Sequence, residues 1–181
     1  KNELTLAAAW RFVEQKKEVL VYCALRSSVE TLGRLALKCI EHEVLSPLKT
    51  ANQRVRDVMA VGAEWLGEDH PAVACLAHGV ALHHGGLPRP FLTEVERLLR
   101  SGDCPLIIAS PTLAQGLNLS ASVLLVPSIW RSGRIIAPAE FANVAGRAGR
   151  AFVDVEGVVL HVVHETEAWE ARRALQNWGE L

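Results

Sequence analysis

Five short stretches of the chain are almost continuously apolar. They are EVLVYCA (18–24), GVALHH (79–84), CPLIIAS (104–110), SVLLVPS (122–128) and GVVLHVV (157–163). Runs of this length that are apolar on both faces are typical of strands in a parallel sheet covered by helices on either side. The pattern therefore predicts five buried strands.

Helical periodicity fills the segments between these strands. Apolar residues recur at three- and four-residue spacing over 29–40, 55–66 and 92–99, which is the spacing of one helix face. Prolines flank Arg89 at the start of the last of these helices, and Gly102 follows its end, as these residues prefer. The alternation predicts an α/β fold, a three-layer sandwich with a mainly parallel sheet and helices on both faces.

Domain organisation follows from the same pattern. Amphipathic helices at 3–17 and 165–178 extend the alternating region at its two ends, and no linker or repeat interrupts it. We predict a single domain over residues 1–181. The chain starts without methionine, which suggests a piece of something longer.

Composition narrows the function classes. The 181 residues are 50% hydrophobic, so disorder is excluded as a description of the whole chain. The formal net charge of -1 means that any nucleic-acid contact must come from a local cluster of cations. The four cysteines form no CxxC pair, so we predict no metal site and read them as buried thiols of a cytoplasmic, reducing compartment. No apolar run is long enough to cross a membrane, and no membrane partner is expected.

Ligands of parallel α/β sheets gather at the carboxyl ends of the strands, and the second predicted strand is followed there by HHGGLPRP (83–90). Gly85 and Gly86 can turn sharply and expose backbone N–H groups to a phosphate. His84 adds polar atoms beside them. The alternative interpretation is a plain strand-to-helix turn whose histidines are satisfied within the fold.

The third predicted strand is followed by SPTLAQGLNLSA (110–121). Ser110 and Thr112 offer hydroxyls that either cap a helix or bond to a phosphate oxygen. Gly116 interrupts the segment, and the amide of Asn118 suits a sugar hydroxyl. A tightly packed crossover with a local cap is the alternative.

The segment EFANVAGRAGRAF (140–152) holds two arginines three residues apart. At helical spacing Arg147 and Arg150 project from one face, and Gly146 and Gly149 leave space beside them. Guanidinium groups are planar, charged partners for phosphate oxygens, so the pair resembles a clamp on a polyphosphate. A surface salt bridge is the alternative, but it gives the glycines no purpose.

GVALHHGGLPRP, IIASPTLAQGLNLSA and FANVAGRAGRAFVDVEG occur in this order. Together they resemble the second RecA-like lobe of a superfamily-two helicase, of the DEAD/DEAH type, in the Ski-like branch. The resemblance covers about residues 18–163, and three matched segments in order are far more specific than one. It implies a RecA-like fold of the P-loop NTPase class and a role in an ATP-dependent nucleic-acid helicase or translocase.

The resemblance implies two sets of site residues. Arg147 and Arg150 would be the catalytic arginines that reach the ATP phosphates held by the other lobe. The remaining residues expected near ATP are Gly116, Asn118, Asn143 and Gly146. Those expected to contact the backbone of single-stranded nucleic acid are Arg26, Ser27, His84, Gly85, Gly86, Ser110 and Thr112.

Two positions depart from the family pattern. Asn143 stands where the family usually has glutamine, one methylene longer, and Leu25 stands where it usually has serine. Any contact made by those family side chains is lost or rebuilt here.

The nucleotide-binding half of an ATPase site is missing from the sequence. No glycine precedes a lysine, so no GxxxxGK[ST] loop is present, and GEDH (67–70) has its acidic residues in the wrong order for a magnesium-binding box. We therefore expect ATP and Mg²⁺ to be held by an N-terminal RecA-like lobe of the same polypeptide, and this chain alone to be inactive.

Two other function classes stay open. A non-catalytic module that binds nucleic acid or protein would not need the arginine pair. An independent doubly wound nucleotide-binding enzyme would carry a GxGxxG segment after its first strand, and none is present.

Overall fold

The computed structural model describes residues 1–49, 51–111, 121–146, 148, 157–163 and 168–181. Its centre is a five-stranded, fully parallel sheet. In spatial order the strands are β2 (Val80–His83), β3 (Leu106–Ala109), β1 (Val19–Tyr22), β4 (Val123–Val126) and β7 (Val158–His161). Each lies inside one of the five predicted ranges, so the predicted α/β fold with a parallel sheet is confirmed.

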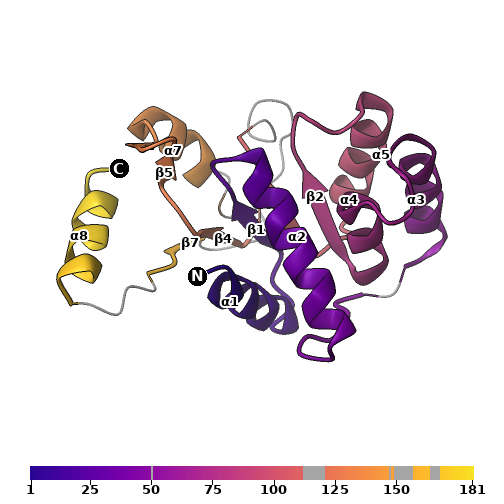
Figure 1. Cartoon of the computed structure of the whole chain (residues 1–181), viewed down its shortest axis with the longest axis horizontal. Helices are drawn as coiled ribbons and strands as arrows, with labels where there is room; N and C mark the ends of the chain where they lie inside the picture. Colours follow the sequence, from indigo (N-terminus) through magenta and orange to yellow (C-terminus); the bar gives the residue numbers. More distant parts are fainter. Residues whose placement is uncertain (50, 112–120, 147, 149–156, 164–167) are drawn as a thin grey trace.

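The strands are paired in level register. Val19 lies opposite Leu106 on one side and Val123 on the other, and Val80 also lies opposite Leu106. Because the strands are parallel, their carboxyl ends all meet at one edge of the sheet. In Figure 1 this edge lies toward the top, where α2 begins.

Helices cover both faces of the sheet. They are α1 (Asn2–Glu14), α2 (Arg26–Glu41), α3 (Gln53–Leu66), α4 (Pro71–Ala74), the 3-10 helix η1 (Cys75–His78), α5 (Arg89–Arg100), α7 (Pro138–Ala145) and α8 (Ala168–Gly179). α1 and α2 contact each other and the central strands, while α3 packs on α5. Consecutive strand residues point to opposite faces: His83 contacts Glu96 of α5, and His84 faces Glu30 of α2. α2 and α5 therefore lie on opposite sides of the sheet.

Local sequence signals set the ends of several helices. The Asn52 side chain accepts a hydrogen bond from the Val55 backbone N–H and caps α3 at its start. α5 has proline in its first turn, and Gly102 follows its last residues with φ +69°. That left-handed conformation favours glycine, which confirms the predicted stop.

Buried apolar side chains from strands and helices form a continuous core among the described residues. β1, β2, β3 and β4 are buried at every position, as predicted. The prediction was wrong for β7, because alternate residues Val158 and Leu160 are exposed. β7 is one of the two edge strands of the sheet, and β2, the other, is buried at every position. The exposure of Val158 and Leu160 therefore reflects incomplete cover of one face of β7 and not its edge position alone.

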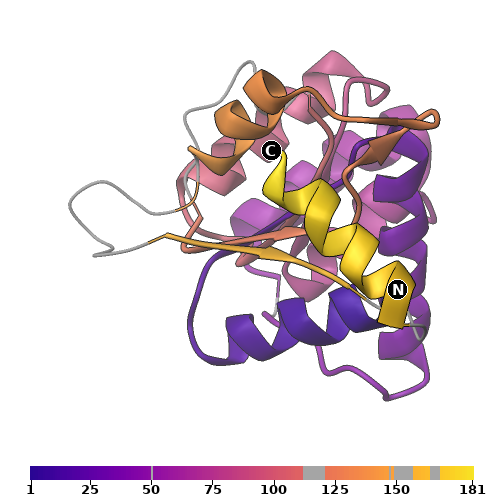
Figure 2. The same ribbon diagram turned by 90° about the vertical axis from the view of Figure 1, so that its left-hand side faces the viewer.

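Sequence patterning missed a two-stranded hairpin. Strands β5 (Trp130–Arg131) and β6 (Arg134–Ile135) are antiparallel and lie between β4 and α7. Figure 2 shows α8 crossing in front of β7 at this end of the molecule. The indole of Trp178 in α8 stacks on His161 of β7 and meets Phe141 of α7 edge to face, both at 4.9 Å between ring centres.

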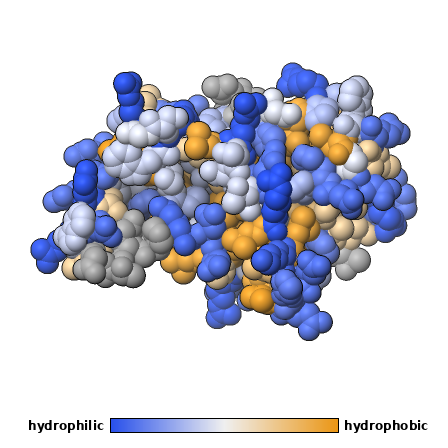
Figure 3. Space-filling view, in the orientation of Figure 1, coloured by the Kyte–Doolittle hydropathy of each residue, from blue (hydrophilic) through white to orange (hydrophobic). Residues whose placement is uncertain are grey.

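The surface seen in Figure 3 is mostly hydrophilic, with apolar atoms gathered over α1 and the lower part of α2. Among the described helices, none combines the length and apolarity needed to cross a membrane. The same part of the chain contains no group of three or more histidine, cysteine, aspartate or glutamate side chains placed to hold a metal ion.

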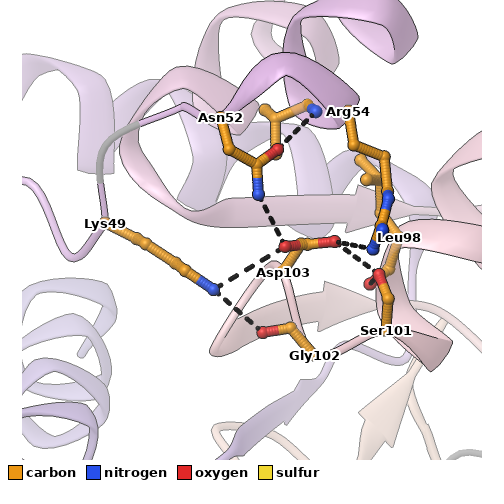
Figure 4. A network of polar contacts seen from close by, with 8 residues as sticks. Lys49, Asn52, Arg54, Leu98, Ser101, Gly102 and Asp103 are labelled. Carbon is orange, nitrogen blue, oxygen red and sulfur yellow. Dashed lines mark hydrogen bonds and ion pairs between the residues drawn. The ribbon is translucent and has the colours of Figure 1, made fainter.

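A buried carboxylate ties two connecting segments together at the amino edge of the sheet (Figure 4). Asp103 accepts hydrogen bonds from Asn52 Nδ2 at 2.8 Å, Arg54 Nη1 at 2.9 Å and the Ser101 hydroxyl at 2.5 Å. Lys49 Nζ lies 3.8 Å from the same carboxylate. The bond from Ser101 lowers the pKa of Asp103 most, against the opposing effect of burial, and the bonds from Asn52 and Arg54 lower it further.

We expect Asp103→Ala to lower the free energy of unfolding by about 2 kcal/mol, because it removes a buried, charged acceptor that bonds Asn52, Arg54 and Ser101. Urea denaturation at neutral pH measures the loss. Asp57→Ala removes an exposed carboxylate with one bond to Gln53 and serves as the matched control, with a loss below about 0.5 kcal/mol. Because the Asp103 pKa is depressed in the folded state, the Asp103→Ala difference should shrink as pH falls through that pKa. Equal losses in the two variants would contradict the role assigned to Asp103.

Candidate nucleic-acid interface

Hydrogen bonds between neighbouring strands continue into the loops at the carboxyl edge. The backbone N–H of Cys23 donates to the carbonyl of Ala109 at 2.8 Å, and that of Ser110 donates to the carbonyl of His83 at 3.0 Å. These bonds hold the segments after β1, β2 and β3 side by side. The predicted residues Arg26, His84, Gly86 and Ser110 are thereby brought to one place.

Arg26 lies over the glycine turn that follows β2. It is the first residue of α2, and a Cβ atom built on Gly86 would lie 3.2 Å from its Nη1 atom and 3.1 Å from His84 Nδ1. No larger residue fits at Gly86 without moving these groups. The close approach explains the glycine that the sequence pattern singled out.

The outer surface of this turn carries a positive charge. Arg26, Ser27, Gly85 and Gly86 are all exposed. Within the part of the chain that the structure describes, Arg26 forms no ion pair with a carboxylate. An uncompensated guanidinium beside exposed backbone is suited to bind an anionic phosphate.

His84 faces inward, away from this surface. It is 3% exposed, and its Nδ1 accepts a hydrogen bond from the Gly86 backbone N–H at 3.2 Å. The neutral ring therefore carries its proton on Nε2, which lies 3.4 Å from Glu30 Oε1 on α2. This geometry makes His84 a support that shapes the glycine turn, and its ring does not reach the exposed surface formed by Arg26 and Ser27.

His83 is a second buried histidine, and it faces the opposite side of the sheet. Its Nε2 lies 3.2 Å from Glu96 Oε1 on α5, and its Nδ1 has no hydrogen-bond partner among the described residues. Burial lowers the pKa of His83, and the carboxylate of Glu96 only partly opposes this. Burial likewise lowers the pKa of His84, against the opposing charge of Glu30. Both rings are thus favoured in the neutral form.

The other predicted residues divide between buried, exposed and undescribed positions. Ser110 is 2% exposed, so its hydroxyl lies below the surface that Arg26 and Ser27 form. Asn143 and Gly146, expected near ATP, are exposed at the C-terminal end of α7. The remaining predicted site residues lie outside the described residues, namely Thr112, Gly116, Asn118, Arg147 and Arg150.

The sequence of the chain is similar to those of several known proteins. The chain is 30% identical over 165 residues, 89% of its length, to the ATP-dependent DNA helicase Hel308 of Thermoplasma acidophilum. It is 36% identical over 96 residues, 50% of its length, to the antiviral helicase SKI2 of Saccharomyces cerevisiae. It is also 29% identical over 161 residues, 87% of its length, to the Hachiman protein HamB of Bacillus cereus. No model of a known protein family matches the chain.

The chain is a homologue of the Ski-like helicases. The resemblance drawn from its three sequence segments is thereby confirmed. The chain spans 23% of the Hel308 protein, 14% of HamB and 7% of SKI2.

Sequence reasoning missed the acidic residues that hold the histidines of this helicase homologue. Glu30 and Glu96 come from two helices on opposite faces of the sheet. Glu30 meets a histidine that is distant in sequence, and Glu96 meets one 13 residues earlier in the chain. The sequence held one signal for Glu30: it lies one helical turn after Arg26 in α2, and so on the same helix face as the residue that approaches the glycine turn. The partner of Glu96 becomes evident only when α5 is packed against β2.

We expect the free energy of unfolding to fall as pH is lowered from about 7 to about 5. The unfolded chain takes up protons near the ordinary histidine pKa, while the folded chain resists protonation of His83 and His84, so acid favours the unfolded state. Denaturation at a series of pH values measures the slope. His83→Gln should reduce it, and His42→Gln, at an exposed position after α2, is the matched control. A slope that is unchanged by His83→Gln and His84→Gln would contradict the argument.

Proposed function

We propose that this chain is the second RecA-like lobe of an ATP-dependent helicase or translocase that moves along single-stranded nucleic acid. Homology to the Ski-like helicases supports the family. The observation that carries the proposal is the exposed Arg26 guanidinium over the glycine turn at the carboxyl edge of the sheet. A phosphodiester backbone is the partner that this cation and turn fit best.

The proposal assigns different roles to two lobes. The first lobe, in the same polypeptide, would supply the phosphate loop and hold ATP and Mg²⁺. Arg147 and Arg150 would follow α7 toward that nucleotide and neutralise charge on the transferred phosphoryl group. Asn143, Gly146, Gly116 and Asn118 would line the same cleft.

Movement along the strand would come from closure and opening of the two lobes. ATP draws the lobes together because its phosphates attract the arginines, and hydrolysis weakens that attraction. If each lobe holds the strand through its backbone, each cycle shifts one grip relative to the other. The grip is expected to be independent of sequence and sensitive to salt.

A cytoplasmic setting is part of the proposal. Cys23, Cys75 and Cys104 are free and buried, and burial raises the pKa of each thiol to about 12. Such thiols are unreactive, and they fit a compartment that forms no disulfides.

We expect Arg26→Gln to weaken binding of a fluorescein-labelled oligothymidylate to the chain several-fold. It should also reduce the slope of log affinity against log salt by about 1, because one phosphate contact is lost. Fluorescence anisotropy at several salt concentrations measures both. Lys38→Gln removes an exposed cation at the far end of α2 and should change neither quantity. Equal effects in both variants would show that binding follows overall charge and not this turn.

In the two-lobe protein, Arg150→Ala should lower kcat for ATP by about a thousandfold or more while leaving ATP affinity nearly intact. Steady-state turnover and equilibrium binding of ATP separate the two effects. This chain alone should hydrolyse no ATP. Equal loss of affinity and turnover, or turnover by the isolated chain that Arg150→Ala removes, would refute the proposed role.

A further inference from the structure

A polar cluster outside the interface joins three segments that are distant in sequence. Its members are Tyr22 at the end of β1, Arg131 in strand β5 of the hairpin, and Glu140 in the first turn of α7. We refer to these three residues as the Tyr22–Arg131–Glu140 triad. None of them was singled out from the sequence as a site residue.

Arg131 is the hub of the triad. Its Nη1 donates a hydrogen bond to Glu140 Oε2 at 2.9 Å. Its Nη2 donates to the Tyr22 hydroxyl at 3.2 Å and also contacts Glu140 Oε1. Its Nε donates to the backbone carbonyl of Ala24 at 3.0 Å. The forked guanidinium is thus engaged in three directions, which a lysine ammonium on a flexible stem cannot reproduce.

The triad is partly shielded from water. Tyr22 is 2% exposed, and its hydroxyl donates to Glu140 Oε1 at 2.5 Å. Burial raises the pKa of Glu140, but the bonds from Arg131 and Tyr22 outweigh this and lower it overall. Glu140 is therefore charged at neutral pH and pairs with a charged guanidinium in a site of reduced dielectric, where such bonds are strong.

The positions of the triad connect the two proposed halves of the site. Ala24 lies two residues before Arg26, in the segment that leads into the nucleic-acid interface. Glu140 lies in α7, whose C-terminal end leads into 147–150 with the proposed catalytic arginines. Apolar contacts among the described residues also hold α7: Val144 is buried, and Phe141 packs against Trp178. The triad is the polar connection between β1 and α7 among the described residues.

We propose that Arg131 and Glu140 are positioning residues that couple the strand-binding segment 24–28 to α7, so that binding of nucleic acid alters the placement of the catalytic arginines. The inference rests on the proposed function. A displacement of Ala24 when a strand binds at Arg26 is transmitted through the guanidinium to Glu140 and hence to α7. Because coupling between two ligands is reciprocal, ATP must alter strand affinity by the same factor.

The test measures this coupling directly in the two-lobe protein. The affinity for a fluorescein-labelled oligothymidylate is determined with and without a non-hydrolysable ATP analogue, and the ratio is the coupling factor. We expect wild type to show a factor of about ten. In Arg131→Gln and in Glu140→Gln the factor should fall close to one, while each ligand binds alone with wild-type affinity. The double variant should be no worse than either single variant, because both remove the same link.

Controls separate coupling from general damage to the fold. Arg134→Gln makes the same change of charge in the same hairpin, at an exposed residue, and should keep the coupling factor. Arg131→Lys should give an intermediate factor. If the variants at 131 and 140 fail to fold, Tyr22→Phe removes only the hydroxyl of the triad and should still reduce the factor.

The outcomes distinguish this inference from the proposed function. A wild-type factor above one that Arg131→Gln, Glu140→Gln and Tyr22→Phe all preserve would overturn the inference and leave the proposed function intact. A wild-type factor of one would overturn it as well, because no coupling would exist to be transmitted. Failure of wild type to bind either ligand would instead refute the proposed function.

Discussion

Level register of the parallel sheet is the constraint on which the rest of the structure depends. Buried strands of equal depth end at the same edge, and backbone hydrogen bonds from Cys23 to Ala109 and from Ser110 to His83 extend this order into the loops. One residue of slippage in β2 would move Gly86 away from Arg26 and turn both histidines to the wrong faces. The register thus positions the chemistry, although the residues that set it are apolar and carry none themselves.

At the carboxyl edge of the sheet, the histidine that supports the glycine turn is buried, and the arginine that lies over the turn is exposed. Both histidines are buried beside carboxylates of helices on opposite faces of the sheet, and burial favours their neutral form. His84 also bonds Gly86 and so helps to fix the shape of the turn. Arg26 is exposed and forms no ion pair with a carboxylate among the described residues. The same division recurs around α7, where a shielded triad fixes the helix and exposed residues at its C-terminal end face outward. A charge already neutralised inside the fold has little attraction left for a phosphate.

Local pattern was sufficient to predict the five strands, the main helices and the glycine stop after α5, because continuous apolar runs and helix caps are encoded over a few residues. It was insufficient where long-range packing decides. β7 has the same apolar composition as its neighbours, yet alternate residues are exposed because one of its faces is incompletely covered, unlike β2 at the other edge. His84 resembles a ligand-binding residue in sequence, yet Gly86 and Glu30 turn it inward. Arg131, Glu140 and Asp103 acquire their roles from partners that only the folded chain brings near.

The central claim is that nucleic acid binds at the carboxyl edge of this sheet. Backbone amide NMR shifts of the isotope-labelled chain, followed during titration with an oligothymidylate, test it most directly. The account predicts that the largest changes fall in 23–28 and 83–87 and that the Asp103 network at the opposite edge is unaffected. Changes concentrated around 98–103, with none at the carboxyl edge, would contradict it.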